Sequence, residues 1–511
     1  MKKTIRKTVL LTASIAVMLF VSCEDYIDVN KDPNNPEVSE LTPDNILPGA
    51  QTTTATTFGT RMNQLGNIMS VSWSANATDF ISPLDDEFRY NFTTTFYDDI
   101  WDNLYQRTAN FSHIERYEDG KNWDYHKAIS KVLKSFYFQY LVDLYGDLPY
   151  TEIHRGTEIL FPKYDDDMAT YRVLIAELDE AIDLIDNTDD TTVRSVETFD
   201  VMMQGNMQKW KRFANTLKLR ILLRQSQLGD APTQTYLTQE FNNLQNSGAQ
   251  FLAANENVTI NPGYLNSDGK QNPFYAIYGR DPQGDPTSTY RLIGPSKFTA
   301  DFLRGLLPGR SVADPRRLRL FQSRTAGSTT ITGVLQGASS GRPSYLGPGI
   351  IKNSNQDMII MQSAESLFLQ AEAVQRGYLS GDAKALFESG IGASFTLLQV
   401  PNPPFPSPAA IDLYITASSG VNTIGWNGSA NKIEAIITQK WIANNCINGI
   451  ESWIELTRTG FPSGLPLPLT TNSATKPIRL LYPASEYSGN TNNVPNQTTA
   501  DAFNSPVFWD N

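Results

Sequence analysis

The stretch Leu141–Tyr150, LVDLYGDLPY, marks the end of a predicted helix and shows how the chain is built. Leu141 to Tyr145 form the last turn of this helix, Gly146 can cap it, and Pro149 prevents its continuation. A second stretch, Trp453–Gly460, also reads as a helix end that passes into a Pro-rich turn. We interpret both stretches as residues that maintain the fold and not as a ligand site.

Helices are predicted to carry most of the chain on either side of these stretches. In 171–186, apolar residues recur at helical spacing while Glu177, Glu180 and Asp183 form a solvated face. Further helices are predicted over 98–118, 124–145, 207–228, 357–377, 382–395 and 429–447. Irregular segments are predicted at about 250–350, at 396–428 and from 460 to the end. The expected fold class is mostly α: a single large helical domain with long irregular loops and a few short strands.

One helix pair carries a repeat pattern. Between Glu372 and Ile391, Gly377-Tyr378 is followed by Ala383-x-x-x-Phe387-x-x-Gly390. This pattern resembles the turn and second helix of a tetratricopeptide unit, in which small residues allow helices to approach closely. Because only one copy is readable, we predict a bundle with tetratricopeptide-like helix pairs and not a regular solenoid.

The helix predicted over 207–228 has a basic face. The cationic side chains opposite its apolar stripe are Lys209, Lys211, Arg212, Lys218, Arg220 and Arg224. A basic helix can attract an anionic ligand. In a chain this acidic, we predict instead that these side chains pair with carboxylates of neighbouring helices and cover apolar surface with their stems.

The composition is that of a large acidic protein. Of 511 residues, 40% are hydrophobic and 11% aromatic, which is ample for a large core and excludes a disordered chain. The net charge is −12, and removal of residues 1–22 takes away four basic and no acidic residues, which leaves −16. Such a chain repels phosphate backbones, so nucleic acid is not expected as a partner.

The N-terminus predicts export and a lipid anchor. Four basic residues within 2–7 precede an apolar run from about Thr8 to Val21, which is the layout of a secretory signal. Cys23 directly after the cut resembles the lipobox of bacterial lipoproteins, in which this cysteine takes diacylglycerol and further acyl chains such as palmitate. The alternatives are a plain signal peptide with a chance cysteine, or a membrane span. The apolar run is too short to cross ~30 Å of hydrocarbon comfortably.

Three segments follow from this interpretation. Residues 1–22 are the signal peptide, 23–50 a tether of turns and extended chain, and 51–511 the helical domain with its loop-rich insertion at about 250–350. The tether begins with Glu24-Asp25, an acidic pair that resembles a surface-export signal, although it also suits an ordinary polar tether.

Cysteine usage excludes a disulfide framework. With Cys23 lipidated, only Cys446 remains, so no disulfide can form within the mature chain. Cys446 lies on a predicted apolar helix face, and we expect a buried, unreactive thiol.

The residue sets that common enzymes need are mostly missing. The histidines His113, His126 and His154 form no H-E-x-x-H zinc motif, and neither a Walker A loop nor a dinucleotide fingerprint occurs. Gly337–Gly341 matches G-x-S-x-G, but it lies in Gly/Ser/Thr-rich sequence and no histidine follows it. No catalytic residue is therefore predicted.

Acidic clusters do not change this conclusion. They occur at 85–87, 165–167 and 189–190. A glycosidase needs two carboxylates that face each other across a cleft, and acidic residues that are contiguous in the sequence do not indicate that arrangement. Because a sequence does not show pairs built from distant residues, a surface glycoside hydrolase stays as a minor alternative.

Several short stretches together resemble the SusD/RagB family of outer-membrane nutrient-binding lipoproteins, and particularly its SusD-like branch. They are SCEDY at 22–26, NKDPN at 30–34, DLYGDLPY at 143–150, ANTLKLR at 214–220, AEA at 371–373, QKWI at 439–442, WIELTRTG at 453–460 and RLLYP at 479–483. Their order and spacing over about 460 residues make the match specific. The resemblance implies a helical domain with tetratricopeptide-like pairs that serves as the lid-like partner of a SusC-like, TonB-dependent barrel transporter.

We therefore expect a non-enzymatic protein, lipid-anchored in the outer membrane and facing the cell exterior, that binds oligosaccharides and hands them to the barrel. A RagB-like peptide receptor is the alternative. Loop aromatics set among Asn, Asp and Gly can stack on sugars while their neighbours form hydrogen bonds. The predicted ligand contacts, taken from regions where the family's sites fall, are Trp73, Phe88, Tyr90, Tyr264, Tyr275 and Tyr290. No cofactor or metal is expected, and a structural Ca²⁺ ion at the 281–290 loop is left open.

Overall fold

The structure, a computed structural model, describes residues 41–400 and 408–510. The signal peptide, Cys23 and the tether up to residue 40 lie outside the described residues. Within the described ranges, no helix is both long and apolar enough to cross a membrane.

The described chain opens with a helix that the sequence analysis missed. α2 (Pro43–Thr57) continues through the π-helix η3 (Phe58–Met62) into α3 (Asn63–Met69). Proline suits the first turn because it lacks the N–H that has no helical partner there. The run QTTTATT in α2 does not look helical in the sequence, because β-branched residues have a lowered helix propensity. In the structure, Thr54 and Thr56 donate their hydroxyls to backbone carbonyls one turn back. The prediction of turns and extended chain is therefore wrong from Pro43 onward.

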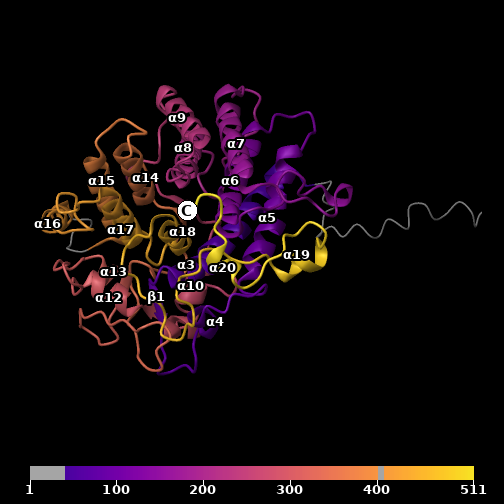
Figure 1. The fold of residues 1–511 in the computed structure, drawn as a ribbon. Coiled ribbons are helices and arrows are strands. Elements are labelled where there is room, and N and C mark those ends of the chain that lie inside the picture. Colours follow the sequence, from indigo (N-terminus) through magenta and orange to yellow (C-terminus); the bar gives the residue numbers. More distant parts are fainter. Residues whose placement is uncertain (1–40, 401–407, 511) are drawn as a thin grey trace, which may run out of the picture.

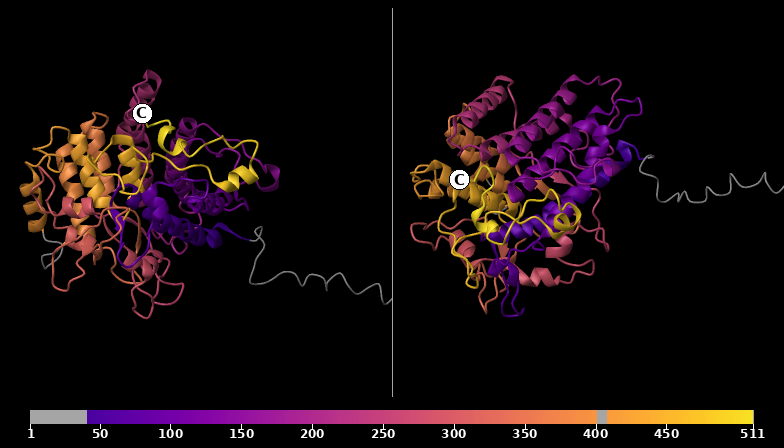
Figure 2. Two further views of the ribbon diagram at one scale, coloured as in Figure 1. Left: turned by 60° about the horizontal axis from the view of Figure 1, so that its bottom comes forward. Right: turned by 45° about the vertical axis from the view of Figure 1, so that its right-hand side comes forward.

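Long helices then pack side by side through most of the molecule (Figure 1). α5 packs on α6, α6 on α7, α7 on α8, and α8 on α14, which contacts both α15 and α17. The two views in Figure 2 show the same helices as a continuous body above the loops. Their bounds are α5 (Asp98–Arg116), α6 (Asp124–Tyr145), α7 (Asp167–Asn187), α8 (Met207–Arg224), α9 (Ala231–Asn246), α14 (Ser363–Gln375), α15 (Ala383–Leu398), α17 (Lys432–Asn444) and α18 (Gly449–Thr459).

Local signals explain where several of these helices begin and end. Asp166, Asn206 and Asp230 each accept a hydrogen bond from the backbone N–H three residues on, and so cap α7, α8 and α9. α6 ends at Tyr145, as predicted, and Gly146 follows it with a φ of 76° that favours glycine. The mostly α fold class predicted from sequence is confirmed.

The predicted tetratricopeptide-like pair is α14 with α15. Phe387 packs edge-on against Phe368 with ring centroids 6.2 Å apart. A Cβ on Gly390 would lie only 2.7 Å from the Phe368 ring, so a glycine is required for this close approach.

Short elements replace the long helices between about 250 and 350. Among the described residues, three two-stranded antiparallel sheets involve this region, and two of them take one strand from outside it: β1 pairs with β3, β2 with β6 and β4 with β5. The strands are β1 (Trp73–Ala75), β2 (Val258–Ile260), β3 (Ile293–Pro295), β4 (Phe321–Gln322), β5 (Tyr345–Leu346) and β6 (Met358–Met361). The short helices in this part are α10 (Pro273–Tyr278), α11 (Ser288–Leu292), α12 (Lys297–Leu303) and α13 (Arg317–Leu320).

Some predicted boundaries differ from the structure. The helix predicted over 357–377 starts with strand β6, whose β-branched and Met residues pair with β2. The helix predicted over 207–228 ends at Arg224, and the segment predicted as irregular over 396–428 contains a helix. The remaining elements are α4 (Asp85–Arg89), η4 (Gly156–Glu158), α16 (Pro408–Ser418), α19 (Ala484–Gly489) and α20 (Asp501–Asn504).

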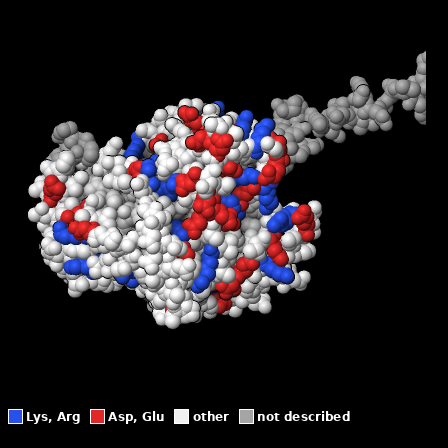
Figure 3. Space-filling view, turned by 90° about the horizontal axis from the view of Figure 1, so that it is seen from above, with Lys and Arg blue, Asp and Glu red and all other residues white. Residues whose placement is uncertain are grey.

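Most of the basic face of α8 is paired with carboxylates, as predicted, although Lys209 donates to the carbonyl of Asn257 and Arg212 pairs with Glu256 of a loop. Lys218 contacts Asp179 of α7 and Glu240 of α9 at 2.7 and 2.8 Å, and Lys211 pairs with Asp186. Figure 3, which views the molecule from above, shows acidic and basic side chains interspersed over this surface.

The inner side of α8 enters a fully buried ionic network. Arg224 donates to Glu451 at 2.8 Å and to Glu455 at 2.7 Å, both on α18. Lys440 of α17 donates to the same two carboxylates at 2.8 and 3.1 Å. Arg458 completes the network, because it bridges Glu455 to α14.

The network extends into α14, and its cations keep Glu455 ionised. Arg458 donates to Glu372 at 2.8 and 2.9 Å, and Arg220 donates to Glu365 at 3.0 Å. Burial alone would raise the pKa of Glu455, but Arg458 and the other cations lower it well below its usual value. The stretch 453–460, interpreted from sequence as fold-maintaining, thus supplies two of the buried ions, Glu455 and Arg458.

Replacing one member of the network should destabilise the protein strongly. We expect Glu455→Gln to lower the free energy of unfolding by about 3–5 kcal/mol, because three cations lose a buried carboxylate partner. Urea denaturation followed by circular dichroism measures this change. The control is Glu118→Gln, because Glu118 pairs with Lys127 but its side chain is 75% exposed, and a change under ~1 kcal/mol is expected. Equal effects of the two substitutions would contradict the structural role of the network.

Candidate functional site

The first candidate site consists of loops that the β1–β3 pairing brings together at the bottom of Figure 1. Trp73 in β1 lies opposite Pro295 in β3, so the chain after β1 runs beside the chain before β3. The N–H of Asn76 donates to the carbonyl of Leu292 at 2.8 Å and extends this contact beyond the strands. We call the three segments that meet there the loop face: 76–90, 279–292 and 324–345.

An ion pair joins two segments of the loop face. Arg342 donates to both carboxylate oxygens of Asp79, with a shortest N–O distance of 2.6 Å, and Asn76 Nδ2 donates to the same group at 2.8 Å. These hydrogen bonds lower the pKa of Asp79 to about 2, so the carboxylate is ionised at physiological pH. The side chains of Arg342 and Asp79 are 54% and 42% exposed, so the pair orders the surface and not the core.

Two stacked tyrosines form the aromatic part of the loop face. The rings of Tyr290 and Tyr345 have centroids 4.8 Å apart and planes inclined by 13°. Arg324 lies 4.0 Å over the Tyr345 ring and donates to its hydroxyl at 2.8 Å, and Arg280 lies 5.7 Å over Tyr290. Aromatic edges, guanidinium groups and carbonyls therefore meet at one surface, and such a mixture can contact both C–H and hydroxyl groups of a ligand.

A cavity of about 350 Å³ opens within the loop face. We call it the loop cavity; Phe80, Phe88 and Thr470 are among its lining residues. Ile81, also part of the lining, is 98% exposed. An exposed apolar side chain beside a cavity of mixed polar and apolar lining is suited to contact with a partner or ligand.

The G-x-S-x-G match lies at this cavity but lacks the context of a catalytic serine. Ser339 sits in a loop and not in a turn between a strand and a helix. His126 forms a hydrogen bond with Asp44 of α2 at 2.9 Å, and His154 forms one with Ser112 of α5 at 2.8 Å. Both imidazoles therefore have partners on helices and not at Ser339.

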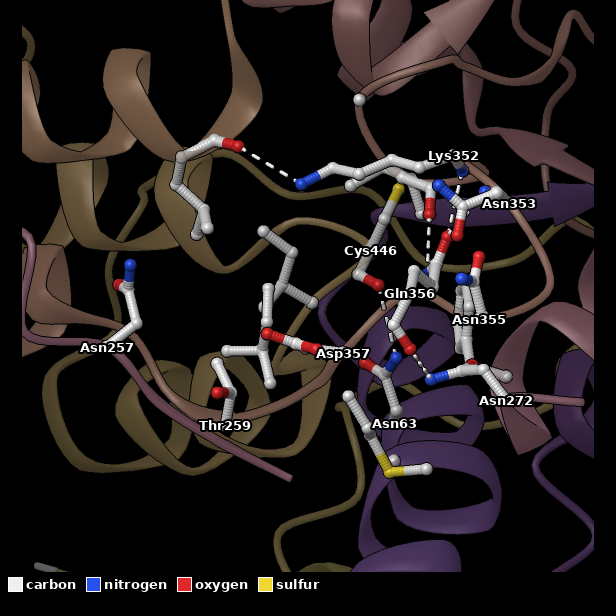
Figure 4. A pocket seen from close by; sticks show the side chains of 18 residues that line it. Asn63, Asn257, Thr259, Asn272, Lys352, Asn353, Asn355, Gln356, Asp357 and Cys446 are labelled. Carbon is white, nitrogen blue, oxygen red and sulfur yellow. Dashed lines mark hydrogen bonds between the residues drawn. The ribbon is translucent and has the colours of Figure 1, made fainter. Parts of the chain in front are cut away.

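A second cavity of about 420 Å³ lies between η3, α10, β6 and the loop that precedes β6 (Figure 4). Apolar side chains, including Phe274, Met358 and Leu397, line part of it. Because amides dominate its polar lining, we call it the amide cavity. These amides belong to Asn63, Asn257, Asn272, Asn353, Asn355 and Gln356.

Several of these amides are fixed by hydrogen bonds to the protein. Asn272 accepts from the N–H of Tyr275 and donates to the carbonyl of Gln356, both at 2.9 Å. Gln356 in turn accepts from the N–H of Lys352 at 2.8 Å and donates to the carbonyl of Ile350 at 3.1 Å. The wall of the amide cavity is therefore built before any ligand arrives.

The residues predicted as ligand contacts do not gather in one place. Phe88 and Tyr290 reach the loop face, and Trp73 lies in β1 with its Nε1 3.2 Å from Cys446 Sγ. Tyr90 packs between Phe92 and Phe503. The buried members are Trp73, Phe88, Tyr90, Tyr264 and Tyr290, each less than 9% exposed, while Tyr275 on α10 is half-buried. Their role in binding stays a prediction.

Tyr345 is one of the loop aromatics of the irregular middle but was not among the predicted ligand contacts, and neither Arg324 nor the Asp79–Arg342 pair was predicted. Their partners lie far away in the chain, and strands of two or three residues give no pattern from which the pairing could be read. The amide cavity had one visible signal, the polar run Asn353-Ser-Asn-Gln-Asp357 between β5 and β6.

One set of carboxylates in the described part of the chain could hold a cation. The nearest ligand oxygens of Asp147, Asp166 and Asp167 all lie within 4.8 Å of one another. Burial raises the pKa of Asp167 to about 6. At the 281–290 loop, Asp281 and Asp285 form a tight turn in which the N–H of Asp285 donates to the Asp281 carboxylate at 2.8 Å.

Comparison with known proteins gives a consistent result. The family model described as SusD-like, starch-binding associating with outer membrane, matches residues 33–483. A solved chitin-binding SusD homolog from Flavobacterium johnsoniae is 24% identical with a TM-score of 0.69, over 91% of this chain and 98% of that chain. A SusD homolog from Bacteroides fragilis NCTC 9343 is 18% identical with a TM-score of 0.70, over 89% and 95%. A SusD-like protein from Bacteroides thetaiotaomicron VPI-5482 is 22% identical with a TM-score of 0.69, over 92% and 98%. No curated protein sequence matches the chain.

The thiol of Cys446, which lines the amide cavity, should be unreactive in the folded protein. Cys446 is 1% exposed, and burial raises the pKa of its thiol to about 12. Because the thiolate is the reactive species, we expect no reaction with Ellman's reagent in the native state and rapid reaction in urea. A Cys446→Ser variant gives the background. Rapid native-state reaction that this substitution abolishes would contradict the burial.

Proposed function

The chain belongs to the SusD-like family, and from this premise we propose that it is a non-catalytic, cell-surface protein that binds oligosaccharides and delivers them to a TonB-dependent outer-membrane transporter. One observation carries the proposal for the site: a chain of this family presents, on neighbouring loops, stacked tyrosines together with arginine, asparagine and aspartate side chains. Sugar rings need such a mixture, because their faces are apolar and their edges carry hydroxyls.

The stacked tyrosines are the centre of the proposed glycan site. Tyr290 and Tyr345 hold each other in place, and Arg324 fixes Tyr345 by a hydrogen bond at 2.8 Å. A site that is already ordered loses less conformational entropy on binding than a mobile one. The neutral character of most oligosaccharides also agrees with a chain whose net charge is strongly negative.

Two carboxylates of the loop face are engaged by side chains of the protein itself. Arg342 keeps Asp79 ionised, so this group does not suit the role of the general acid of a glycosidase. Burial raises the pKa of Glu87, which accepts a hydrogen bond from Tyr97 at 2.9 Å. These contacts support a role in ordering the loop face for binding.

The proposed anchor and partner follow from the family and the N-terminal sequence. Cys23 would carry the lipid, and the Asn/Pro-rich segment after it would let the helical body open and close beside a SusC-like barrel. The ligand is proposed to be an oligosaccharide. One solved relative is named as a chitin-binding homolog, and the family model is described as starch-binding. A panel of test ligands should therefore contain oligomers of N-acetylglucosamine as well as starch fragments.

Glycan binding should depend on the stacked tyrosines. We expect Tyr345→Ala to weaken binding of a recognised oligosaccharide by about 3- to 10-fold, which corresponds to ~0.5–1.5 kcal/mol for one aromatic contact. Isothermal titration calorimetry against maltoheptaose, chitohexaose and a tryptic peptide mixture measures this loss.

The matched control is Tyr378→Ala. Tyr378 stacks on Phe241 with ring centroids 4.3 Å apart, but this pair lies on α9 and the turn after α14. Release of shorter sugars during the titration would identify a hydrolase. Binding of peptides without any glycan would favour the RagB-like alternative, and equal losses in both variants would place the glycan elsewhere.

The lipid anchor is tested separately. We expect Cys23→Ser to move the protein from the outer-membrane fraction to the soluble fraction, because the net charge gives no electrostatic attraction to anionic lipid. Immunoblots of fractionated cells measure the distribution, and the Cys446→Ser variant should remain with the membrane. A Cys23→Ser protein that stays membrane-bound would contradict the anchor.

A further inference from the structure

The amide cavity has the properties of a ligand site that is separate from the loop face. Its volume of about 420 Å³ falls in the range of ~300–1,000 Å³ typical of small-molecule sites. It shares no lining residue with the loop cavity. α10 stands between the two regions, with Phe274 in the amide cavity and Tyr278 against the Trp73 ring at 5.2 Å.

Hydrogen-bonding groups in the amide cavity are left unused by the protein. Among the described residues, the side chains of Thr259, Asn353 and Asn355 have no hydrogen-bond partner, and neither does Nδ2 of Asn257. The Oδ1 of Asn257 accepts from the N–H of Ser363, so the free amide group has a fixed orientation. Amides and hydroxyls both donate and accept, which matches the dual character of sugar hydroxyls.

The charges of the amide cavity favour a neutral ligand. Of the described residues that line it, only Lys352 and Asp357 are charged, and their charges cancel. Lys352 Nζ has a single long contact, 3.4 Å to the carbonyl of Leu397, visible at the top of Figure 4. Asp357 accepts from Asn261 at 2.8 Å through one oxygen and keeps the other free. The ammonium can therefore donate further hydrogen bonds and the second carboxylate oxygen can accept them, and a ligand rich in hydroxyls offers both kinds of partner.

Lys352 is an exposed residue and forms no ion pair among the described residues, so a ligand can reach its ammonium from solvent. Desolvation, with the nearby Arg319 adding to it, lowers the pKa of Lys352. The apolar side of the cavity, with Phe274 and Met358, provides the surface on which the C–H face of a ring can rest.

We propose that the amide cavity is a second binding site, which takes one or two rings of a neutral sugar. This second-site proposal rests on the proposed function, because the amide cavity would bind the same class of ligand as the loop face. A mono- or disaccharide would be held by Lys352, by Asp357 and by the free groups of Asn257 and Thr259.

The test compares short and long sugars on the full-length lipidated protein in detergent. The probes are maltose and N,N′-diacetylchitobiose, with maltoheptaose and chitohexaose as the long ligands and glycylglycine as the zwitterionic control.

We expect a disaccharide to bind the wild type, and Lys352→Met or Thr259→Val to weaken its binding by about tenfold through loss of one charged or one neutral contact. The Lys270→Met variant is the matched control, because Lys270 is an exposed lysine of the same irregular region that does not line the cavity. Thermal unfolding followed by circular dichroism verifies that each variant is folded.

The outcomes separate this proposal from the proposed function. Disaccharide binding that is weakened by Lys352→Met but retained in Tyr345→Ala supports the second site. Disaccharide binding that is lost in Tyr345→Ala and unchanged in Lys352→Met overturns it and leaves the loop-face proposal intact. Binding of long sugars with no disaccharide binding also overturns the second site alone. Binding of glycylglycine in place of sugar overturns the ligand class, and no binding of any sugar overturns both proposals.

Discussion

The arrangement of the helices depends on a network of buried charges. The cations come from α8, α17 and α18, and the carboxylates come from α14 and α18, with Asp143 of α6 at its border. A charge without its partner in the protein interior costs several kcal/mol, so each ion must meet its counterion in one register of the helices. The network therefore links helices of the first half of the chain to helices of the second half. An apolar core alone would tolerate small slips between helices, and we infer that this network does not.

The same helices hold the loops that carry the proposed site. Trp441 of α17 donates from Nε1 to the carbonyl of Ser70 at 3.1 Å, where α3 ends and the chain turns into β1. Gln336 then donates to the carbonyls of Ile68 and Trp73 at 2.8 and 2.7 Å, and so fastens the last segment of the loop face to β1. The buried ionic network is thus connected to the loop face through α17, α3 and β1. A site on such supports is ordered before ligand arrives, and its loops can vary without disturbing the helices.

Sequence reasoning predicted the helices and the family, but not the contacts. Amphipathic spacing located α5 to α8, and Gly390 and Phe387 indicated the α14–α15 pair. The stretches that carry the family resemblance contain Arg220, Glu372, Lys440, Glu455 and Arg458, yet nothing local distinguishes these ions from solvated ones. Their burial follows from partners that lie up to more than two hundred residues away.

The candidate site was harder to predict for a related reason. Aromatic residues in loops can face a ligand or the core, and Trp73 belongs to the core because β1 directs it toward Tyr278 and Cys446. Tyr345 and Arg324 gain their place only through the packing of distant segments. We propose that a helical body fixed by buried charges presents a preordered loop face to a glycan. Amide hydrogen–deuterium exchange of the protein, measured with and without a bound oligosaccharide, tests this proposal. We expect new protection in segments 76–90 and 324–345 while exchange in α8, α14, α17 and α18 remains unchanged; protection that spreads through these helices, or that leaves the loop face unaffected, would overturn the proposal.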